Sequence, residues 1–575
     1  MKVFLILVSR PLLFLMLLAV PTGWGLNAHG QLRIVTYNTN TFDTEGLAPG
    51  LPTNFRTVRP EADIVFEAIG EESLNGIARP ADIVLLQEQQ QPDTTTQNLV
   101  DRLNTIYAGT GITYARGFEI GRTTGSTGFG TPSSNELRQS VVYRTDTVTL
   151  IDEDSFGGIS GPTQPRETLL HRFRPIGYGP DADLYIFNSH FEAGDNTGFG
   201  DDRFARENEA TDIREYIEDN VPAGANVIVG GDLNVDSNFE TSGTSTFGGL
   251  SSLQILTAPG DARVLDPFNP TSAPLTYNNN FSLAAILTQS PANDGPGPLT
   301  GGGIDDRFDF LLQSDELLDG EGVASIPGSM RAFGNNGSTF NDEINDGNTI
   351  QLNGLTSFTT AQVLNALEAA SDHLPVVEDF QLPAVLDVVA ASVPATLNVG
   401  DDFDLALGIS NAADVSVALG ADELDYVFNT SGDLFGSGGG IDAALGGGVT
   451  ELVTLDTSTP GIKSGLITVT ATSAAAANAL VTIPVSFEVL AAALLGDFTG
   501  DGQVEQGDLN LVLNNWGETR TFGDGASVFS TSVVDQEELN AVLNNWGQAA
   551  APNFADSSVP EPAWALGLLS AALLK

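Results

Sequence analysis

Short apolar runs that end in polar residues recur over residues 31–383 of the chain. Each run joins β-branched, aliphatic and aromatic residues between turn-forming residues, a pattern that predicts buried strands. The runs with their polar ends read IVTYN to Asn38, DIVLLQE to Glu88, YIFNSH to His190, VIVGGDLN to Asp232 and Asn234, and RFDFLL around Asp309. Because burying unpaired polar groups is costly, we expect these side chains to gather in one polar site at the edge of a packed sheet.

Helical patterns alternate with these runs, at Arg203–Asp219 and Thr360–Ala370. Strands that alternate with helices predict an α/β sandwich over residues 31–383. Three insertions rich in Gly, Ser, Asn or Pro predict surface loops, at Thr241–Gly249, Pro291–Gly303 and Gly334–Gly354.

The pattern changes over residues 384–490, where alternating runs such as DFDLALGI and GLITVTA lie between Gly, Asp and Asn turns. This alternation predicts an all-β sandwich of immunoglobulin-like size. The segment has no candidate site chemistry, so we expect a spacer or a binding domain.

Residues 494–549 contain an internal repeat, since LNLVLNNWG at 509–517 recurs as LNAVLNNWG at 539–547. Leu509, Val512, Leu513 and Trp516 are spaced to share one helical face. Repeats of this kind predict duplicated helical units that pack on each other.

Composition limits the function classes. At 575 residues the chain is expected to form three or four domains, and without cysteine it has no disulfide and no thiolate metal ligand. The net charge is −51, and the only lysines are Lys2, Lys463 and Lys575. Nucleic-acid binders usually show a basic surface. The acidity indicates either a solvated surface suited to salty surroundings or a substrate that is not a long polyanion, although arginines in the motif region leave room for a local positive groove.

Glu88 and the pair Asp232 and Asn234 have the groups that bind metal and phosphate. A carboxylate at the edge of an apolar strand fits a hard divalent cation, and the alternative is an arginine partner. Residues i and i+2 of a strand share one face, so Asp232 and Asn234 would project together; the alternative is an ordinary turn after two glycines.

His190 and His373 are candidate acid–base groups, because histidine titrates near neutral pH and an adjacent carboxylate can orient it. Asp309 is suited to that orienting role. The chain has two other histidines, of which His171 is expected to be a satisfied strand residue and His29 lies beside the predicted signal.

The ordered set VTYN, LLQE, NSHFEAGD, VGGDLN, RFDFLL and SDHLP resembles the endonuclease/exonuclease/phosphatase superfamily, which includes deoxyribonuclease I, exonuclease III-type enzymes and neutral sphingomyelinases. The resemblance implies a four-layer α/β sandwich with two packed mixed sheets. It also implies hydrolysis of phosphodiesters or phosphomonoesters that depends on Mg²⁺ or Mn²⁺.

The resemblance also implies a role for each matching residue. Asn38 and Glu88 match the metal end of the family site, and Asp372 lies near it. Asp232 and Asn234 match the pair that positions the nucleophile and the scissile phosphate, Asp309 and His373 match an Asp–His pair, and His190 matches the histidine of the deoxyribonuclease I and sphingomyelinase branches. Asn40 stands where several abasic-site enzymes have an acidic residue, which argues against that branch.

A second metal motif, DFTGDGQVEQGD, spans residues 497–508. Its spacing of oxygen ligands, with glycine at the sixth position, is that of a calcium loop. The expected Ca²⁺ ligands are Asp497, Thr499, Asp501, Gln503, Glu505 and Asp508. With the following helix and the repeat, the segment resembles a dockerin module, which implies a cohesin-like or other cell-surface partner. The second copy has Ser527, Phe529 and Thr531 at the early ligand positions but keeps Asp535 and Glu538, so we expect one calcium ion.

Both ends of the chain predict export. Residues 1–28 read as a signal peptide, with Lys2 and Arg10 beside the apolar segment Pro11–Val20. Residues 559–575, which begin Val-Pro-Glu-Pro, resemble a PEP-CTERM sorting signal of bacterial exported proteins. Its apolar stretch is too short for a ~30 Å hydrocarbon core, so we expect a secreted or cell-surface protein whose mature chain has no stable membrane span.

We therefore predict a secreted Mg²⁺-dependent phosphodiester hydrolase, an extracellular nuclease. One alternative on the same fold is a phosphatase or a sphingomyelinase-like phosphodiesterase. An alternative of another class is a non-catalytic surface or scaffold protein with a decayed nuclease domain.

Overall fold

The computed structural model describes residues 31–41, 57–89, 92–117, 138–157, 166–195, 201–243, 248–295, 299–491, 494–520 and 532–549. These residues form two compact units. The first runs to Pro383 and includes Ala413–Asp422, and the second contains Ala384–Ala412 and the chain from Glu423 onward. The predicted signal peptide and sorting tail lie outside the described residues.

The first sheet of unit 1 has strand order β11-β13-β1-β2-β4-β3, with β12 also paired to β13. β1 and β2 are parallel, and the other pairs are antiparallel. The strands are β1 Gln31–Asn38, β2 Ile83–Gln89, β3 Tyr114–Arg116, β4 Arg138–Arg144, β11 Ala324–Ser325, β12 Arg331–Ala332 and β13 Val376–Gln381.

The second sheet has strand order β5-β6-β7-β8-β10-β9. Here β7 and β8 are the parallel pair, and the other strands are antiparallel. The strands are β5 Val148–Gly157, β6 Glu167–Pro175, β7 Leu184–His190, β8 Asn226–Asp232, β9 Val264–Leu265 and β10 Asp309–Ser314.

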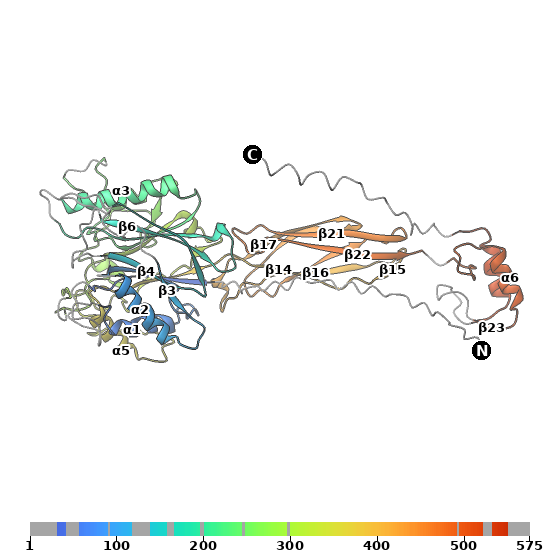
Figure 1. Ribbon diagram of the computed structural model, residues 1–575, viewed down its shortest axis with the longest axis horizontal. Helices are drawn as coiled ribbons and strands as arrows, with labels where there is room; N and C mark the ends of the chain where they lie inside the picture. Colours follow the sequence, from blue (N-terminus) through green and yellow to red (C-terminus); the bar gives the residue numbers. More distant parts are fainter. Residues whose placement is uncertain are drawn as a thin grey trace, which may run out of the picture. The chain divides into compact units, whose positions relative to one another are not determined.

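Helices cover the outer faces of both sheets (Figure 1). Apolar residues of α1, α2 and α5 share one core with β1 and β2, and those of α3 and α4 share another with β7, β8 and β10. The α-helices are α1 Glu61–Glu71, α2 Pro92–Ile106, α3 Asp202–Asn220, α4 Ser252–Thr257 and α5 Thr360–Ala370, and the 3₁₀ turns are η1 Pro180–Ala182, η2 Phe281–Ile286, η3 Asp315–Leu318 and η4 Ala418–Gly420. The predicted α/β class is confirmed, with helices, sheet, sheet and helices in succession.

Local sequence signals set the helix starts. Thr359 and Gln362 form a capping box at the start of α5, and Ser251 and Gln254 form one at α4. The insertion Gly334–Gly354 is not simply a surface loop, because Ile344 is fully buried and packs in the first core.

The two sheets approach closely beneath the strand ends. A Cβ atom at Gly230 of β8 would lie 2.7 Å from Leu85 Cδ1 of β2, so this position accepts only glycine without a shift. Polar groups also cross the gap: Gln87 Nε2 of β2 donates to Asn188 Oδ1 of β7 at 2.8 Å, and Asn188 Nδ2 donates to the Ser140 carbonyl at 2.9 Å. These bonds satisfy buried amides that would otherwise be costly.

Unit 2 contains the sheets β14-β16-β20-β18 and β15-β22-β21-β17-β19. One apolar core includes residues of both sheets, among them Leu407, Val453, Phe428 and Val469. The strands are β14 Leu386–Ala390, β15 Thr396–Asn398, β16 Asp404–Asn411, β17 Leu424–Gly432, β18 Leu434–Phe435, β19 Ser437–Asp442, β20 Val449–Leu455, β21 Gly461–Ala471 and β22 Leu480–Leu490.

The repeat segment forms α6 (Gln506–Asn514), β23 (Thr519–Arg520), β24 (Ser532–Val533) and α7 (Gln536–Asn544). The predicted apolar stripe of the first helix is only partly buried: Val512 is fully buried, but Leu513 is 52% exposed and Trp516 is 48% exposed. The small core of this segment is made instead by Phe498, Val504, Val534 and their neighbours. Among the helices of the described ranges we find none with the length and apolar character to cross a membrane.

The buried carboxyl of Glu378 on β13 predicts a pH-dependent stability. Burial raises its pKa to about 8, although Ser325 and Gln313 donate hydrogen bonds to it. The folded protein therefore holds a proton that the unfolded chain has released, and stability falls as pH rises from about 4.5 to 8. We expect Glu378→Gln to raise the melting temperature relative to the parent protein progressively across this window. The exposed control Glu321→Gln should show no such trend, and parallel profiles for both variants would contradict the assignment.

Candidate active site

The polar strand ends predicted from the sequence meet at one edge of unit 1. Asn38 ends β1 and Glu88 lies near the end of β2, while His190 and Asp232 end the parallel strands β7 and β8 and pair with each other. Asp309 opens β10 directly opposite Asp232. Strand pairing and sheet packing thus bring together residues that lie up to 271 positions apart in sequence.

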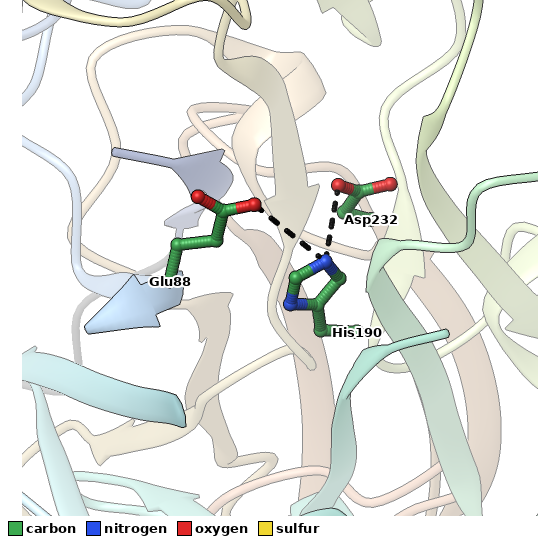
Figure 2. Close-up of side chains that lie close together, drawn as sticks. All are labelled: Glu88, His190 and Asp232. Atoms are coloured by element: carbon green, nitrogen blue, oxygen red, sulfur yellow. Dashed lines mark ion pairs between the residues drawn. The ribbon is translucent and has the colours of Figure 1, made fainter. Parts of the chain in front are cut away.

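Glu88, His190 and Asp232 form a compact cluster (Figure 2). His190 Nε2 lies 3.8 Å from Glu88 Oε1 and 3.6 Å from Asp232 Oδ2. Burial, reinforced by Asp372, raises the pKa of Glu88 to about 7, and burial raises the pKa of Asp232 to about 6. Burial, with the nearby charge of Arg166, lowers the pKa of His190 well below its usual value. The cluster thus combines a neutral imidazole with carboxylates that resist carrying their charge.

His373 is a second imidazole beside Asp232, with 3.7 Å between His373 Nε2 and Asp232 Oδ2. Its Nδ1 lies 2.8 Å from Asp309 Oδ2, within hydrogen-bond distance. Burial disfavours the imidazolium, but Asp309 and Asp232 outweigh it and raise the pKa of His373 well above its usual value. Asp309 thus both orients the ring and favours its protonated form.

Asn38, Asn40 and Asp372 form a hydrogen-bonded edge of the site. Asn38 Nδ2 donates to Asp232 Oδ2 at 3.0 Å, and Asn38 Oδ1 accepts from the Asn40 amide at 3.0 Å. The Asp372 carboxylate accepts from Asn40 Nδ2 at 2.9 Å and 3.0 Å and from the Thr300 amide at 3.0 Å. Asp372 therefore has protein partners, yet its charge still acts on Glu88.

Asn234 lies beside Asp232 through a turn rather than through strand alternation. It follows the end of β8 with φ of 48°, and its backbone amide donates to Asp232 Oδ1 at 3.1 Å. Its side-chain Nδ2 donates to the Phe191 carbonyl at 3.1 Å. The expected alternation is wrong, and the turn alternative describes this position. Gly231 lets the end of β8 lie close to β7, since a Cβ at Gly231 would lie 1.8 Å from the Ser189 carbonyl oxygen.

Several residues of the site carried no sequence signal. Gln289 Nε2 lies 2.9 Å from His373 Nε2, although Gln289 belongs to the loop after η2 and to no motif. Arg166 Nη1 donates to the Phe191 carbonyl at 2.6 Å, and the buried Glu209 of α3 accepts from the amides of Arg166 and Glu192. Arg166 and Glu209 therefore hold the loop that follows β7 and His190.

Six arginines of the motif region have a carboxylate partner: Arg144 with Asp82, Arg166 with Glu192, Arg172 and Arg174 with Asp183, Arg203 with Asp201, and Arg206 with Glu240. His171 departs from expectation, because its Nε2 lies 3.3 Å from Glu153 Oε1 but its buried Nδ1 has no partner among the described residues.

The donor set of the Glu88 cluster fits a divalent cation. One atom each of Glu88, His190 and Asp232 lies within 4.8 Å of the others. Carboxylates that share a buried site repel each other and are stabilised by a cation between them. Burial is the main cause of the raised pKa values of Glu88 and Asp232, and Asp372 adds to it at Glu88 and Asp309 at Asp232.

Comparison with known proteins gave neither a matching family model nor a matching curated protein. Solved structures are similar at low scores. An endonuclease/exonuclease/phosphatase protein from Beutenbergia cavernae covers 80% of this chain and 100% of its own, with 14% identity and a TM-score of 0.33. The human Nocturnin catalytic domain covers 62% of this chain and 95% of its own, with 14% identity and a TM-score of 0.32. A beta toxin from Staphylococcus aureus covers 60% of this chain and 99% of its own, with 14% identity and a TM-score of 0.31.

The three described histidines should titrate differently. We expect His373 to be protonated at pH 7 and His171 and His190 to be neutral, as followed by imidazole ¹⁵N shifts in EDTA. Asp309→Asn should lower the pKa of His373 by about 1–3, the effect of losing an adjacent opposite charge. The surface variant Asp315→Asn should not change it. A wild-type His373 that is neutral at pH 6 would contradict the described geometry.

Proposed function

We propose that the chain is a metal-dependent phosphodiester hydrolase that acts on nucleic acid outside the cell. The observation that supports it best is the position of Asp232, which lies in one cluster with Glu88 and His190 and also beside His373 of the His373–Asp309 pair. A cation site next to an oriented imidazole is the minimum that hydrolysis of a phosphodiester by water requires. The intact set of motif residues argues against a decayed scaffold.

Glu88 would hold Mg²⁺ or Mn²⁺, with Asn38, Asp232 and Asp372 around it. Oxygen donors suit these hard ions better than softer metals. When bound, such an ion offsets the charge that develops on the phosphoryl oxygens.

The other residues handle the proton and the phosphate. Asp309 orients His373, whose Nε2 faces Asp232 and would take a proton from the attacking water once the ring is neutral. His190 is kept neutral by burial and can donate an N–H to a phosphoryl oxygen without adding a charge. Asp232 and Asn234 would position the water and the phosphate. The same machinery would serve a phosphatase or a sphingomyelinase-like phosphodiesterase, so the substrate needs a direct test.

Hydrolysis of plasmid DNA and of bis-p-nitrophenyl phosphate, with Mg²⁺ or with EDTA, tests this proposal. We expect activity with Mg²⁺, loss of it with EDTA and recovery when the ion is restored. His373→Ala and Asp232→Asn should each lower kcat at least about 100-fold, the usual contribution of acid–base catalysis. Asp315→Asn, on the surface, should retain wild-type rates. Undiminished hydrolysis by His373→Ala would contradict the role of His373 as the proton acceptor. If the protein hydrolyses bis-p-nitrophenyl phosphate but not DNA, a phosphodiesterase of another specificity is favoured over a nuclease.

We further propose that residues 497–508 bind one Ca²⁺. Asp497, Asp501 and Asp508 have carboxylate oxygens within 4.8 Å of one another. The loop is already curved around them: the Asp497 carboxylate accepts from the amides of Gly500 and Gly502 at 2.8 Å, and Asp508 accepts from the Thr499 amide at 2.8 Å. Gly502, at the sixth position, has φ of 81°. Thr499, Gln503 and Glu505 would supply the remaining oxygens. A cohesin-like or cell-surface partner and attachment at the surface belong to the same proposal.

Calorimetric titration of the full, metal-stripped chain with CaCl₂ tests the calcium site. Because the catalytic cluster could also bind Ca²⁺, the informative quantity is the difference between variants. Asp501→Ala should bind one equivalent fewer than wild type, while Glu537→Ala in the second repeat should bind the wild-type number. Equal stoichiometry for all three proteins would reject the site.

A further inference from the structure

A cavity of about 400 Å³ lies in unit 1, and its wall includes Asp236, which follows Asn234 by two residues. Its wall is formed by the carboxylates of Asp195, Asp236 and Glu240, the guanidinium of Arg203, the ring of Phe239, and the hydroxyl-bearing residues Ser237 and Thr276. A volume of this size is typical of pockets for small organic ligands. None of these residues belongs to the catalytic set described above.

Chain connectivity places one wall residue of the cavity close to Asn234. Asp236 follows Asn234 by two residues, so their Cα atoms are at most about 7.6 Å apart. Asp195 lies on the loop that leaves His190 at the end of β7. Ser237 pairs with Thr276, which fixes the far wall. A group esterified to a phosphate at Asn234 can therefore extend into the cavity.

The charge of the wall selects what can enter. Oxygens of Asp195, Asp236 and Glu240 lie within 4.8 Å of one another, and burial with the adjacent Asp195 raises the pKa of Asp236. Two cations are close: Arg206 Nε donates to Glu240 at 2.9 Å, and Arg203, itself part of the wall, pairs through Nε with Asp201 at 3.3 Å. Because three carboxylates face one arginine in the wall, a second phosphate would meet net repulsion here, whereas hydroxyl groups would find acceptors.

Phe239 supplies an apolar platform in the same wall. Its side chain is 48% exposed. Large apolar side chains are costly to leave in water, and an aromatic face can stack against a planar ring. Carboxylate acceptors beside a stacking surface match the two parts of a nucleoside, namely a sugar with free hydroxyls and a flat base.

We propose that this cavity binds the nucleoside esterified to the scissile phosphate, with the base on Phe239 and a free sugar hydroxyl donating to Asp236 or Asp195. The assignment rests on the proposed function and adds to it a preference for nucleotide termini over internal phosphodiesters, because a nucleoside with a further phosphate would be repelled. It agrees with the net charge of −51, which disfavours binding along a long polyanion.

Four diesters that all release p-nitrophenol separate the contributions of the nucleoside, of a cationic group and of a further phosphate. They carry p-nitrophenyl phosphate esterified to methanol, to choline, to the 5′ oxygen of thymidine, or to the 5′ oxygen of thymidine 3′-phosphate. Selectivity is the ratio of kcat/KM for each ester to that of the methyl ester. The variants are Phe239→Ala and Asp236→Asn. The control is Phe281→Ala, a phenylalanine that is 71% exposed and outside the cavity wall.

We expect wild type to prefer the thymidine ester over the methyl ester by about tenfold or more, the scale of one stacked base. The 3′-phosphorylated ester should lose most of that preference. Phe239→Ala should lower the thymidine selectivity about tenfold, and Asp236→Asn should lower it while improving the 3′-phosphorylated ester relative to thymidine. Phe281→Ala should keep the wild-type ratios.

Thymidine selectivity that both cavity variants retain would overturn the inference. So would a choline ester that exceeds the thymidine ester and depends on Asp236, because the cavity would then be a site for cationic groups. Either result leaves the proposed hydrolase intact if the methyl ester is hydrolysed and His373→Ala is not active. Wild-type protein that hydrolyses none of the four esters would instead contradict the proposed function, and the inference with it.

Discussion

The carboxylate of Asp232 contacts every other part of the site. It accepts hydrogen bonds from the Asn38 side chain and the Asn234 amide, and it lies 3.6 Å from the imidazole of His190 and 3.7 Å from that of His373. Burial raises its pKa to about 6. A carboxylate in this position is stable only if donors or cations surround it. The surrounding strands must therefore present their polar ends at this one point.

Packing of the two sheets meets that requirement. The parallel pairs β1–β2 and β7–β8 deliver their carboxyl ends to the same edge, and the glycines of β8 allow that strand to approach β2 and the Ser189 carbonyl. Behind the edge, the Gln87–Asn188 bond joins the sheets, and Glu209 with Arg166 holds the loop after His190. The site is therefore supported by buried hydrogen bonds, which resist displacement more than exposed ones do.

Arginine in this protein serves structure more than substrate attraction. Arg33 is fully buried against Asp379, and Arg307 is buried against Asp266 and lies 4.2 Å from the Phe310 ring centroid. Several arginines near the site are paired in the same way. With a net charge of −51, the chain gains little from long-range attraction of polyanions, and the proposed hydrolase would depend on short-range recognition next to the scissile bond.

Much of the fold and part of the site could be predicted from local sequence. Apolar runs predicted the strands that end at Asn38, His190 and Asp232 and the strand that includes Glu88, and a helical pattern predicted the helix Thr360–Ala370, because periodicity is a property of neighbouring residues. Tertiary structure alone decided the turn that places Asn234, the burial of Ile344, the exposure of Trp516 and the contact of Gln289 with His373. Tertiary structure alone also decided the cavity that Asp236 and Phe239 line. Such features depend on which distant segments pack together, and no short window of sequence contains that information.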